Sequence, residues 1–412
     1  MEFFTKYKKI FLIIGFILVV FILGYLLYSV FFKQPEAQPI NIEPTATGTS
    51  AGLPTAGTGA GTIITPSETS TGLPIEPSTS NKIDSTAQGG ITQTNQLSQT
   101  PSIAATLSSD GNNLQYYNQD DGKFYSITKD GQTTLLTDKV FNQVEKITWS
   151  PEKNKAILEY PDGANIVYDF TNKKQITLPT HWKDFDFSPD GSKLVMKSIG
   201  LDPNNRWLAI SNEDGSKAQQ LEAIGDKDET VYPSWSPNNQ TVAMYTKGVD
   251  FNRQEVYFIG LNGENFKSMT IEGRGFQPKW SPSGDKLLYS VYSSNNNLKP
   301  MLWLTNASGD NIGSNRQTLN IETWANKCVF ANSSDLYCAV PEKLEEGSGL
   351  FPEMAKNTKD NLYKIDVKTG LKKLIATPDG NYNMSNLIIP TNNSYLYFTD
   401  ETSKELFKIN LK

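Results

Sequence analysis

The distribution of apolar side chains divides the chain into three regions. Residues 10–32 form a run of 23 positions without a charged side chain, and residues 33–102 contain no aromatic residue. From residue 103 to residue 412, short apolar stretches alternate with turns rich in Gly, Pro, Asn, Asp and Ser. Apolar stretches of about four to eight residues between such turns are typical of β-strands. The sequence therefore predicts an all-β domain over residues 103–412.

A repeated turn punctuates this domain. An aromatic residue is followed by Ser and Pro, and then by an apolar strand such as residues 286–290. Pro at the second position of the turn fixes φ near about −65°, and Gly191 and Gly284 can adopt the positive φ that follows. The period of about 40 to 50 residues is that of propeller blades. The four clearest copies begin with Trp149-Ser-Pro-Glu, Phe187-Ser-Pro-Asp-Gly, Trp235-Ser-Pro-Asn-Asn and Trp280-Ser-Pro-Ser-Gly.

Weaker copies extend the count of units to seven. They begin at Leu107, Phe330 and Ile389, and the last unit ends after its third strand at Leu411. Its fourth strand must come from elsewhere, most simply from residues 91–97, which would close the ring and remove an exposed edge. We expect a seven-bladed β-propeller. A six-bladed ring, in which the first or last unit serves only for closure, is the alternative.

These turns resemble the WSPDG-type (PD40) repeats of TolB-like propellers, which also occur in the propellers of dipeptidyl peptidase IV-type enzymes and of tricorn proteases. Residues 187–191 and 280–284 match the repeat well, whereas residues 149–153 and 235–239 lack its glycine. The resemblance covers residues 103–412 only. It implies a propeller fold and protein partners in a cell-envelope assembly, although no residue carries over a particular partner.

The N-terminal region is expected to anchor the domain in a membrane. The apolar run from Ile10 to Phe32 is long enough to cross a hydrocarbon core of about 30 Å. Three lysines precede it within residues 1–9, and only Lys33 follows it closely. This bias predicts a cytoplasmic tail at residues 1–9 and a propeller outside the plasma membrane, extracellular or periplasmic. A cleaved signal peptide is the alternative, but the run is longer than a signal sequence requires.

Residues 33–102 are predicted to be a disordered stalk. Ser, Thr, Pro, Gly, Ala and Gln dominate this segment. Such a composition buries too little apolar surface to offset the entropy lost on ordering.

Composition limits the chemistry that the domain can perform. A net charge of −6 and a pI of about 5.2 argue against a nucleic-acid partner. One histidine and two cysteines are too few for a His/Cys zinc site. Calcium is the only metal with candidate ligands, at residues 118–122 and 202–205, but neither segment follows the twelve-residue calcium loop and Asx turns account for both. We therefore expect no cofactor.

The expected function is non-catalytic binding. Residues 103–412 contain no Gly-x-Ser-x-Gly elbow. The alternative to a binding function is catalysis without such an elbow. In that case the protein would be a propeller glycan hydrolase or lyase that uses carboxylates at the mouth of the channel. Acidic clusters suited to that role include Asp226, Asp228 and Glu229, and Glu342, Glu345, Glu346 and Glu353.

One face of the propeller is expected to carry the function. The Ser-Pro turns join first to second strands and share a face, whereas the longer segments 201–206, 248–254, 293–299 and 342–360 fall on the opposite face. Function concentrates on loops that a rigid scaffold supports. The candidate binding residues there are His181, Trp182, Tyr232, Arg274, Phe276, Trp324, Tyr382, Arg206 and Arg253.

Two hypotheses explain the aromatic residues of this set, which, together with Phe141, precede most first strands. They form a ring that binds a glycan or peptide at the mouth of the channel, or they wedge adjacent blades together.

The two cysteines are candidates for a disulfide. Cys328 and Cys338 lie on the first and second strands of the sixth unit. A five-residue hairpin loop would place them directly opposite, whereas a four-residue loop would point them to opposite faces. An extracytoplasmic setting permits the bond. Two buried free thiols are the alternative.

Overall fold

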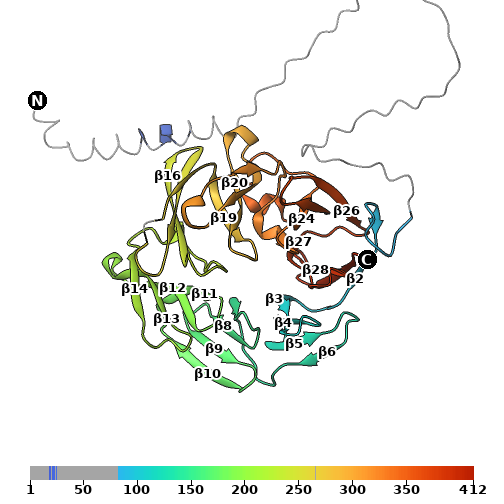
Figure 1. The fold of residues 1–412 in the computed structure, drawn as a ribbon, viewed down its shortest axis with the longest axis horizontal. Helices are drawn as coiled ribbons and strands as arrows, with labels where there is room; N and C mark the ends of the chain where they lie inside the picture. The colour runs from blue at the N-terminus through green and yellow to red at the C-terminus, as the bar shows by residue number, and fades with distance from the viewer. Residues whose placement is uncertain (1–17, 20, 24, 26–81, 265) are drawn as a thin grey trace, which may run out of the picture. The chain divides into compact units, whose positions relative to one another are not determined.

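The computed structural model describes residues 18, 19, 21–23, 25, 82–264 and 266–412. Its folded part is all-β and consists of seven sheets, six with four strands and one with five. The sheets follow one another around a ring in chain order (Figure 1). The predicted seven-bladed propeller is therefore confirmed, and the six-bladed alternative is wrong.

Each blade has four antiparallel strands from its inner to its outer edge. Blade 1 is β3 (Ser102–Leu107), β4 (Leu114–Asn118), β5 (Lys123–Ile127) and β6 (Thr133–Leu135). Blades 2 and 3 are β7 (Lys146–Trp149), β8 (Lys155–Glu159), β9 (Asn165–Asp169), β10 (Lys174–Leu178) and β11 (Trp182–Phe187), β12 (Lys193–Ile199), β13 (Arg206–Asn212), β14 (Gln219–Ala223). Blades 4 and 5 are β15 (Val231–Pro233), β16 (Ala243–Asp250), β17 (Arg253–Ile259), β18 (Met269–Glu272) and β19 (Arg274–Trp280), β20 (Lys286–Tyr292), β21 (Pro300–Asn306), β22 (Gln317–Thr318).

The last two blades recruit strands from the N-terminal side of the domain. Blade 6 is β23 (Cys328–Phe330), β24 (Asp335–Pro341), β25 (Asp360–Asp366) and β26 (Lys372–Pro378), with β1 (Ile91–Thr92) added in parallel to β26. Blade 7 is β27 (Met384–Ile388), β28 (Tyr395–Asp400) and β29 (Leu406–Asn410), and β2 (Thr94–Gln96) is its outer strand. Six 3-10 helices complete the described elements: η1 (Pro203–Asn205), η2 (Asp228–Thr230), η3 (Ser294–Asn296), η4 (Gly309–Asn311), η5 (Ala325–Lys327) and η6 (Pro352–Ala355).

The segment that closes the ring corrects the expected boundary between stalk and propeller. Residues 94–96 supply the outer strand of blade 7 as expected, whereas residues 91–92 pair with blade 6 instead. Ordered contacts also begin well before residue 103. The Asp84 amide donates to the Ile91 carbonyl (2.9 Å), and the Ala87 amide donates to the Asn410 carbonyl (2.9 Å). Composition did not reveal that this segment is ordered, because an outer strand packs few apolar side chains. The residues of β2, for example, are Thr-Asn-Gln. The rest of the predicted stalk, residues 33–81, lies outside the described residues.

The predicted membrane span, residues 10–32, also lies mostly outside the described residues. Among the residues that the structure describes, no helix combines the length and apolar character needed to cross a bilayer. The anchor and the cytoplasmic tail at residues 1–9 stay predictions.

The repeated turns are held by hydrogen bonds within each turn. The Ser188 amide donates to the Lys193 carbonyl (2.9 Å), and the Ser188 hydroxyl accepts from the Lys193 amide (2.9 Å). Gly191 and Gly284 have φ values of 71° and 69°, as expected. Where the glycine is missing, Lys153 and Asn239 adopt φ values of 61° and 62°. The turn geometry therefore survives in the imperfect copies.

In blades 2 and 5, the aromatic residue of the repeat ties the blade to the one before it. Trp149 donates from Nε1 to the Ala104 carbonyl of blade 1 (2.7 Å), and Trp280 donates from Nε1 to Ser234 Oγ of blade 4 (3.1 Å). The apolar clusters likewise lie between neighbouring sheets. Packing between blades thus gives these positions a structural role.

Two opposite faces follow from the antiparallel order of the strands. The turn face carries the connections between first and second strands and between third and fourth strands. The elaborated face carries the connections between second and third strands and between blades, which include residues 200–205, 293–299 and 342–359. Segment 248–254 is not the loop that we expected. Strands β16 and β17 continue to Asp250 and Arg253, which pair across the tip of a hairpin (2.7 Å).

Cys328 and Cys338 form a disulfide. Phe330 pairs with Leu336, so five residues connect the strands and place the two cysteines directly opposite. Both are fully buried.

Candidate binding face

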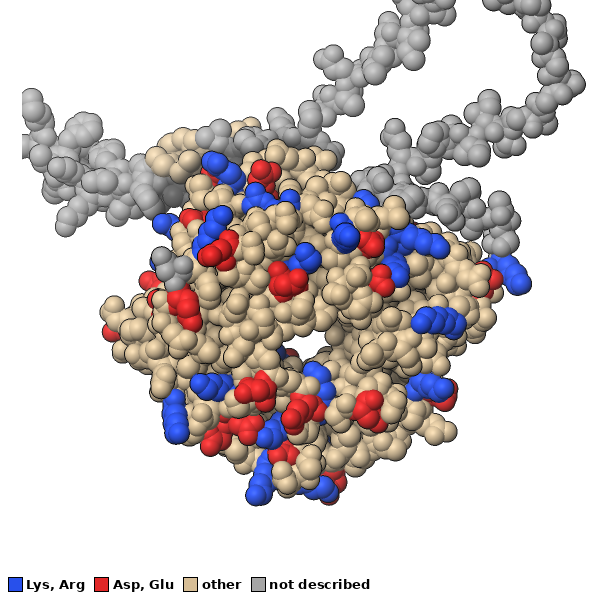
Figure 2. Space-filling model, viewed as in Figure 1, with Lys and Arg blue, Asp and Glu red and all other residues tan. Residues whose placement is uncertain are grey.

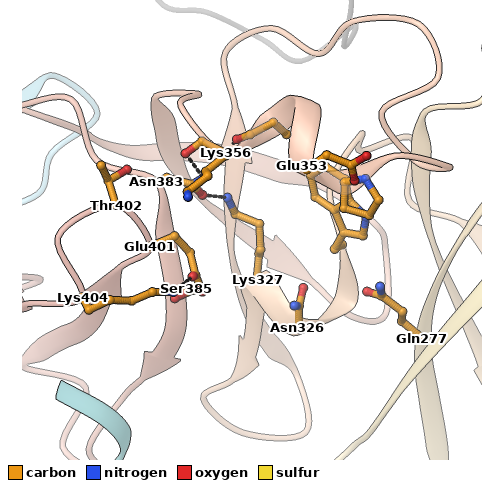
Figure 3. A pocket seen from close by; sticks show the side chains of 13 residues that line it. Gln277, Asn326, Lys327, Glu353, Lys356, Asn383, Ser385, Glu401, Thr402 and Lys404 are labelled. Atoms are coloured by element: carbon orange, nitrogen blue, oxygen red, sulfur yellow. Dashed lines mark hydrogen bonds and ion pairs between the residues drawn. The ribbon is translucent and has the colours of Figure 1, made fainter. Parts of the chain in front are cut away.

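The elaborated face contains a cavity of about 430 Å³ where blades 5, 6 and 7 meet, which we call cavity A. Figure 3 shows Lys327 in its middle, with Thr402 and Glu401 on one side and Glu353 and Gln277 on the other. The lining residues are Gln277 of β19, Trp324 to Lys327 around η5 apart from Ala325, Pro352, Glu353, Ala355 and Lys356 of the β24–β25 loop, Asn383 and Ser385 of blade 7, and Glu401, Thr402 and Lys404 of the β28–β29 loop.

A buried ion pair supports the floor of cavity A. Lys327 Nζ lies 2.6 Å from Asp360 Oδ2, and both side chains are buried. The same ammonium donates to Asn383 Oδ1 (2.5 Å). The Asn383 amide group donates to the carbonyls of Ala355 (3.0 Å) and Lys356 (2.8 Å), which joins the floor to the loop above it. This network fixes the cavity wall from two blades.

Burial raises the pKa of Asp360 to about 6, although Lys327 and the Met384 amide oppose the shift. Asp360 Oδ1 has no hydrogen-bond partner among the described residues. Its buried negative charge therefore depends on Lys327 for compensation.

A second cavity, cavity B, of about 610 Å³, lies between blades 2 and 3 on the same face. His181 and Trp182 line it, together with charged side chains from the first strands of both blades. Lys146 Nζ contacts Glu159 Oε1 (3.7 Å) and Asp184 Oδ1 (2.8 Å), and Lys197 Nζ contacts Asp184 Oδ2 (3.0 Å). Asp184 occupies a bulge of β11 with φ 55°, which turns its carboxylate between the two lysines.

The pKa values of the two carboxyl groups of cavity B shift in opposite directions. Burial raises the pKa of Glu159, while Lys146 and the Asp184 amide oppose this shift. Burial would also raise the pKa of Asp184, but hydrogen bonds and charge from Lys146 and Lys197 lower it to about 2. The same cavity thus holds one carboxyl that retains its proton more readily and one that is readily ionised.

The structure distributes the predicted aromatic residues among separate apolar clusters. Phe141, Trp182, Phe276 and Trp324 are buried, and Tyr232 and Tyr382 are half-buried. Tyr232 packs edge-on against Phe276 (5.7 Å), and Tyr382 packs against Phe407 (4.7 Å). Trp182 lines cavity B and Trp324 lines cavity A, but the six do not form one surface. This burial agrees with the wedge hypothesis for most of the set.

The predicted arginines hold loops and hairpin tips of the elaborated face. Arg206 donates from Nε to the Gly200 carbonyl (3.0 Å) and pairs with Asp226 (3.2 Å). Arg274 donates to the Asp250 carbonyl (3.1 Å), whereas Arg253 pairs with Asp250 and lines a cavity of about 450 Å³ at the tips of blades 4 and 5. His181 is exposed at the edge of cavity B.

The candidate calcium segments are organised as Asx turns. Asn118 Oδ1 accepts from the Asp120 amide (3.0 Å), and Asp202 Oδ1 accepts from the Asn204 amide at the start of η1 (2.9 Å). Within the described ranges, no group of three or more His, Cys, Asp or Glu side chains could hold a metal ion.

Sequence reasoning missed most of the charged residues of both cavities, although Glu353 of cavity A belonged to an acidic cluster that was considered for catalysis. A signal existed for Lys146 and Asp184, because both are charged residues within the first, innermost strand of a blade. Figure 2 shows acidic and basic side chains interspersed around the central opening. No local pattern marked Lys327, Asp360 or Asn383, which come from three separate segments.

Comparison with solved structures shows the fold. No protein-family model and no curated protein sequence matches this chain. The β-propeller domain of Cps50 (Swd1) from Myceliophteria thermophila is similar with a TM-score of 0.52 and 10% identity, covering 77% of this chain and all of that one. An oligogalacturonate lyase in complex with manganese has a TM-score of 0.49 and 14% identity over 77% of this chain and 89% of its own. The hydrazine synthase of Kuenenia stuttgartiensis has a TM-score of 0.49 and 13% identity over 76% and 97%. At such identities, the likeness to the Cps50 domain concerns the propeller fold alone.

Proposed function

We propose that this protein is a membrane-anchored, extracytoplasmic binding platform without catalytic activity. The apolar run from Ile10 to Phe32 anchors it in the plasma membrane, and the elaborated face of the propeller binds a protein, peptide or cell-envelope polymer. The resemblance of the Ser-Pro repeats to TolB-like propellers supports a protein partner in the envelope.

The observation that carries this proposal is the exposure of large apolar side chains on the elaborated face. Leu201, Phe251 and Phe351 are exposed at the tips of blades 3, 4 and 6, and Val249, Leu350 and Met354 accompany them. Leaving such side chains in water costs about 25 cal/mol per Å² of apolar surface, and folding gains nothing from it. Val249 and Phe251 share one hairpin tip, and Leu350, Phe351 and Met354 share one loop. Exposed apolar side chains grouped in this way are typical of interaction sites.

The disulfide supports the proposed location. Disulfides persist in oxidising compartments and are rare in the cytosol. A buried Cys328–Cys338 bond therefore fits a propeller outside the plasma membrane.

Site-specific photo-crosslinking tests the platform. A photoreactive amino acid replaces Phe251 or Phe351 in the full chain in its native host, and Leu371, which is exposed on the turn face, is the matched control. We expect both elaborated-face positions to capture a shared partner and the control to capture none. Equal capture at all three positions, or capture at none, would overturn the proposal.

One observation favours a second function, cleavage of a glycan. Because Glu159 and Asp184 both contact Lys146 and their pKa values diverge, they resemble the carboxyl pairs that divide acid and base roles. Assays of the full chain on a panel of charged and neutral oligosaccharides test this function. Activity that Glu159→Gln abolishes would establish it, and an inactive wild-type chain across the panel would reject it.

A further inference from the structure

Cavity A contains polar groups that have no partner in the described part of the chain. The side chains of Asn326, Glu353, Lys356 and Thr402 make no hydrogen bond or ion pair there, and Gln277 only accepts one long contact from Ser290 (3.5 Å). These groups come from blade 5, the connection into blade 6, the β24–β25 loop and blade 7. A ligand in the cavity would therefore find partners on several sides.

The amides of Gln277 and Asn326 suit a peptide backbone. Each side-chain amide offers an N–H donor and a carbonyl acceptor, the same pair that a backbone peptide group presents. Glu353 and Lys356 lie three residues apart on and just after η6, and both are exposed. Their opposite charges can pair with opposite charges on one ligand.

The loop that forms the outer wall is held rigidly although it projects from the blade. The Gly347 amide donates to the Asn297 carbonyl (2.9 Å), and the Gly349 amide donates to the Leu298 carbonyl (2.8 Å). A Cβ at Gly349 would approach the Leu298 oxygen to 2.6 Å, so only glycine allows this contact. Leu344 and Ala355 of the loop pack with Trp324. A wall ordered in advance loses little entropy when a ligand binds.

The loop that contributes Pro352 and Glu353 to the cavity lining also carries three exposed apolar side chains. They are Leu350, Phe351 and Met354, which are 40%, 51% and 48% exposed. A neutral saccharide offers neither charges for Glu353 and Lys356 nor an apolar side chain for these exposed residues of the loop. A peptide segment offers backbone amides, charges of both signs and apolar side chains together.

We infer that cavity A binds an extended segment of a partner protein that carries an acidic and a basic residue close to an apolar one. This inference rests on the proposed binding platform. The backbone of the segment pairs with Gln277 and Asn326, its charged residues pair with Lys356 and Glu353, and its apolar residue covers Phe351.

Selection from a random peptide library tests the inference, with the full chain in detergent micelles as bait. We expect enriched peptides to contain both charges and an apolar residue. The double variant Glu353→Lys, Lys356→Glu keeps the net charge and should invert the order or spacing of the selected charges. Asn326→Ala should weaken binding of an enriched peptide about fivefold to tenfold in fluorescence anisotropy, as expected for one lost hydrogen bond. Glu152→Lys, exposed on the turn face, should have no effect.

Several outcomes would overturn the inference. These are no enrichment, an unchanged charge pattern in the double variant, or selective binding to a glycan array instead of peptides. If cross-linking at Phe251 and Phe351 still captures a shared partner in the double variant, the platform stands and cavity A is not its peptide site. If cross-linking fails in the wild-type chain, the platform itself fails.

Discussion

The two faces of the propeller are stabilised in different ways. On the turn face the interactions that repeat are local, as between Ser188 and Lys193, which are five residues apart, although Lys155 also pairs with Glu213 of the next blade there (2.7 Å). On the elaborated face they join separate blades, as between Lys327 and Asn383, which are 56 residues apart. Local turns repeat because every blade needs the same reversal. Contacts between blades are individual, and they shape cavities A and B. The difference teaches that the repeated residues build the ring and the unrepeated ones give one face its chemistry.

The largest expected effect comes from the buried ion pair of the elaborated face. Lys327→Met leaves the Asp360 carboxylate buried without its partner and should lower the free energy of unfolding by about 3 to 5 kcal/mol. Urea unfolding of the full chain measures the loss. The double variant with Asp360→Asn should recover part of it. Lys343→Met removes an exposed pair with Glu345 and should change stability by less than about 1 kcal/mol. Equal losses for the two lysines would contradict the contrast between buried and exposed pairs.

The disulfide should contribute the next largest effect. Replacing Cys328 and Cys338 together with Ser removes a cross-link that closes a short loop, which should cost about 2 to 3 kcal/mol. Thermal unfolding without reductant compares the variant with the wild-type chain. Because both cysteines are buried, brief treatment of the folded wild-type chain with reductant should change little. An unchanged melting temperature in the double serine variant would rule out a stabilising bond.

A smaller and gradual effect is expected from pH. Burial raises the pKa of Asp186 and Asp360 to about 6, so the folded state holds their protons more tightly than the unfolded state. Their contribution to stability is complete below about pH 4 and is lost as pH rises through about 6. Asp184, with its pKa near 2, acts in the opposite sense, because its contribution is present above about pH 4 and is lost as pH falls towards 2.

Urea unfolding between pH 4 and pH 7 separates these residues. In Asp186→Asn the decline of stability between pH 4 and pH 6 should become shallower, whereas Asp184→Asn should leave that decline in place. The opposite pattern would show that the pKa shifts of the two carboxyl groups have the wrong sign.

The smallest expected effect is a gain on the turn face. Lys153 adopts a φ of 61° where other copies of the repeat have glycine. Lys153→Gly should therefore raise the free energy of unfolding by about 0.5 to 1 kcal/mol. Gly284→Ala is the matched variant with the opposite expected effect. Gly284 has a φ of 69°, and a Cβ there would lie 2.7 Å from the backbone nitrogen of Asn238. Chemical denaturation of both variants should give changes of opposite sign, and two losses would contradict the role assigned to the left-handed position.

The sequence predicted the ring closely but the ends of its elements less well. The strand at residues 94–96 was expected because blade 7 lacked an outer strand. The ordered segment from residue 84 was not, because its side chains are polar and its order comes from hydrogen bonds to blades 6 and 7. Segment 248–254 was taken for a loop, since a protruding hairpin with polar residues has no core side to produce an apolar pattern.

By itself, the sequence determined the blades and the two faces, and it favoured seven blades over six. Pro, Gly and the aromatic residue of each repeat act within a few residues of chain, so their order is sufficient to predict them. The sequence also identified Cys328 and Cys338 as a candidate pair, because the length of one hairpin loop decides whether they lie opposite each other. Only the tertiary structure decided where the cavities lie and which charges meet in them. Lys327, Asp360 and Asn383 meet because neighbouring blades converge at this point. The separation of the blades depends on the closed ring rather than on any local sequence pattern.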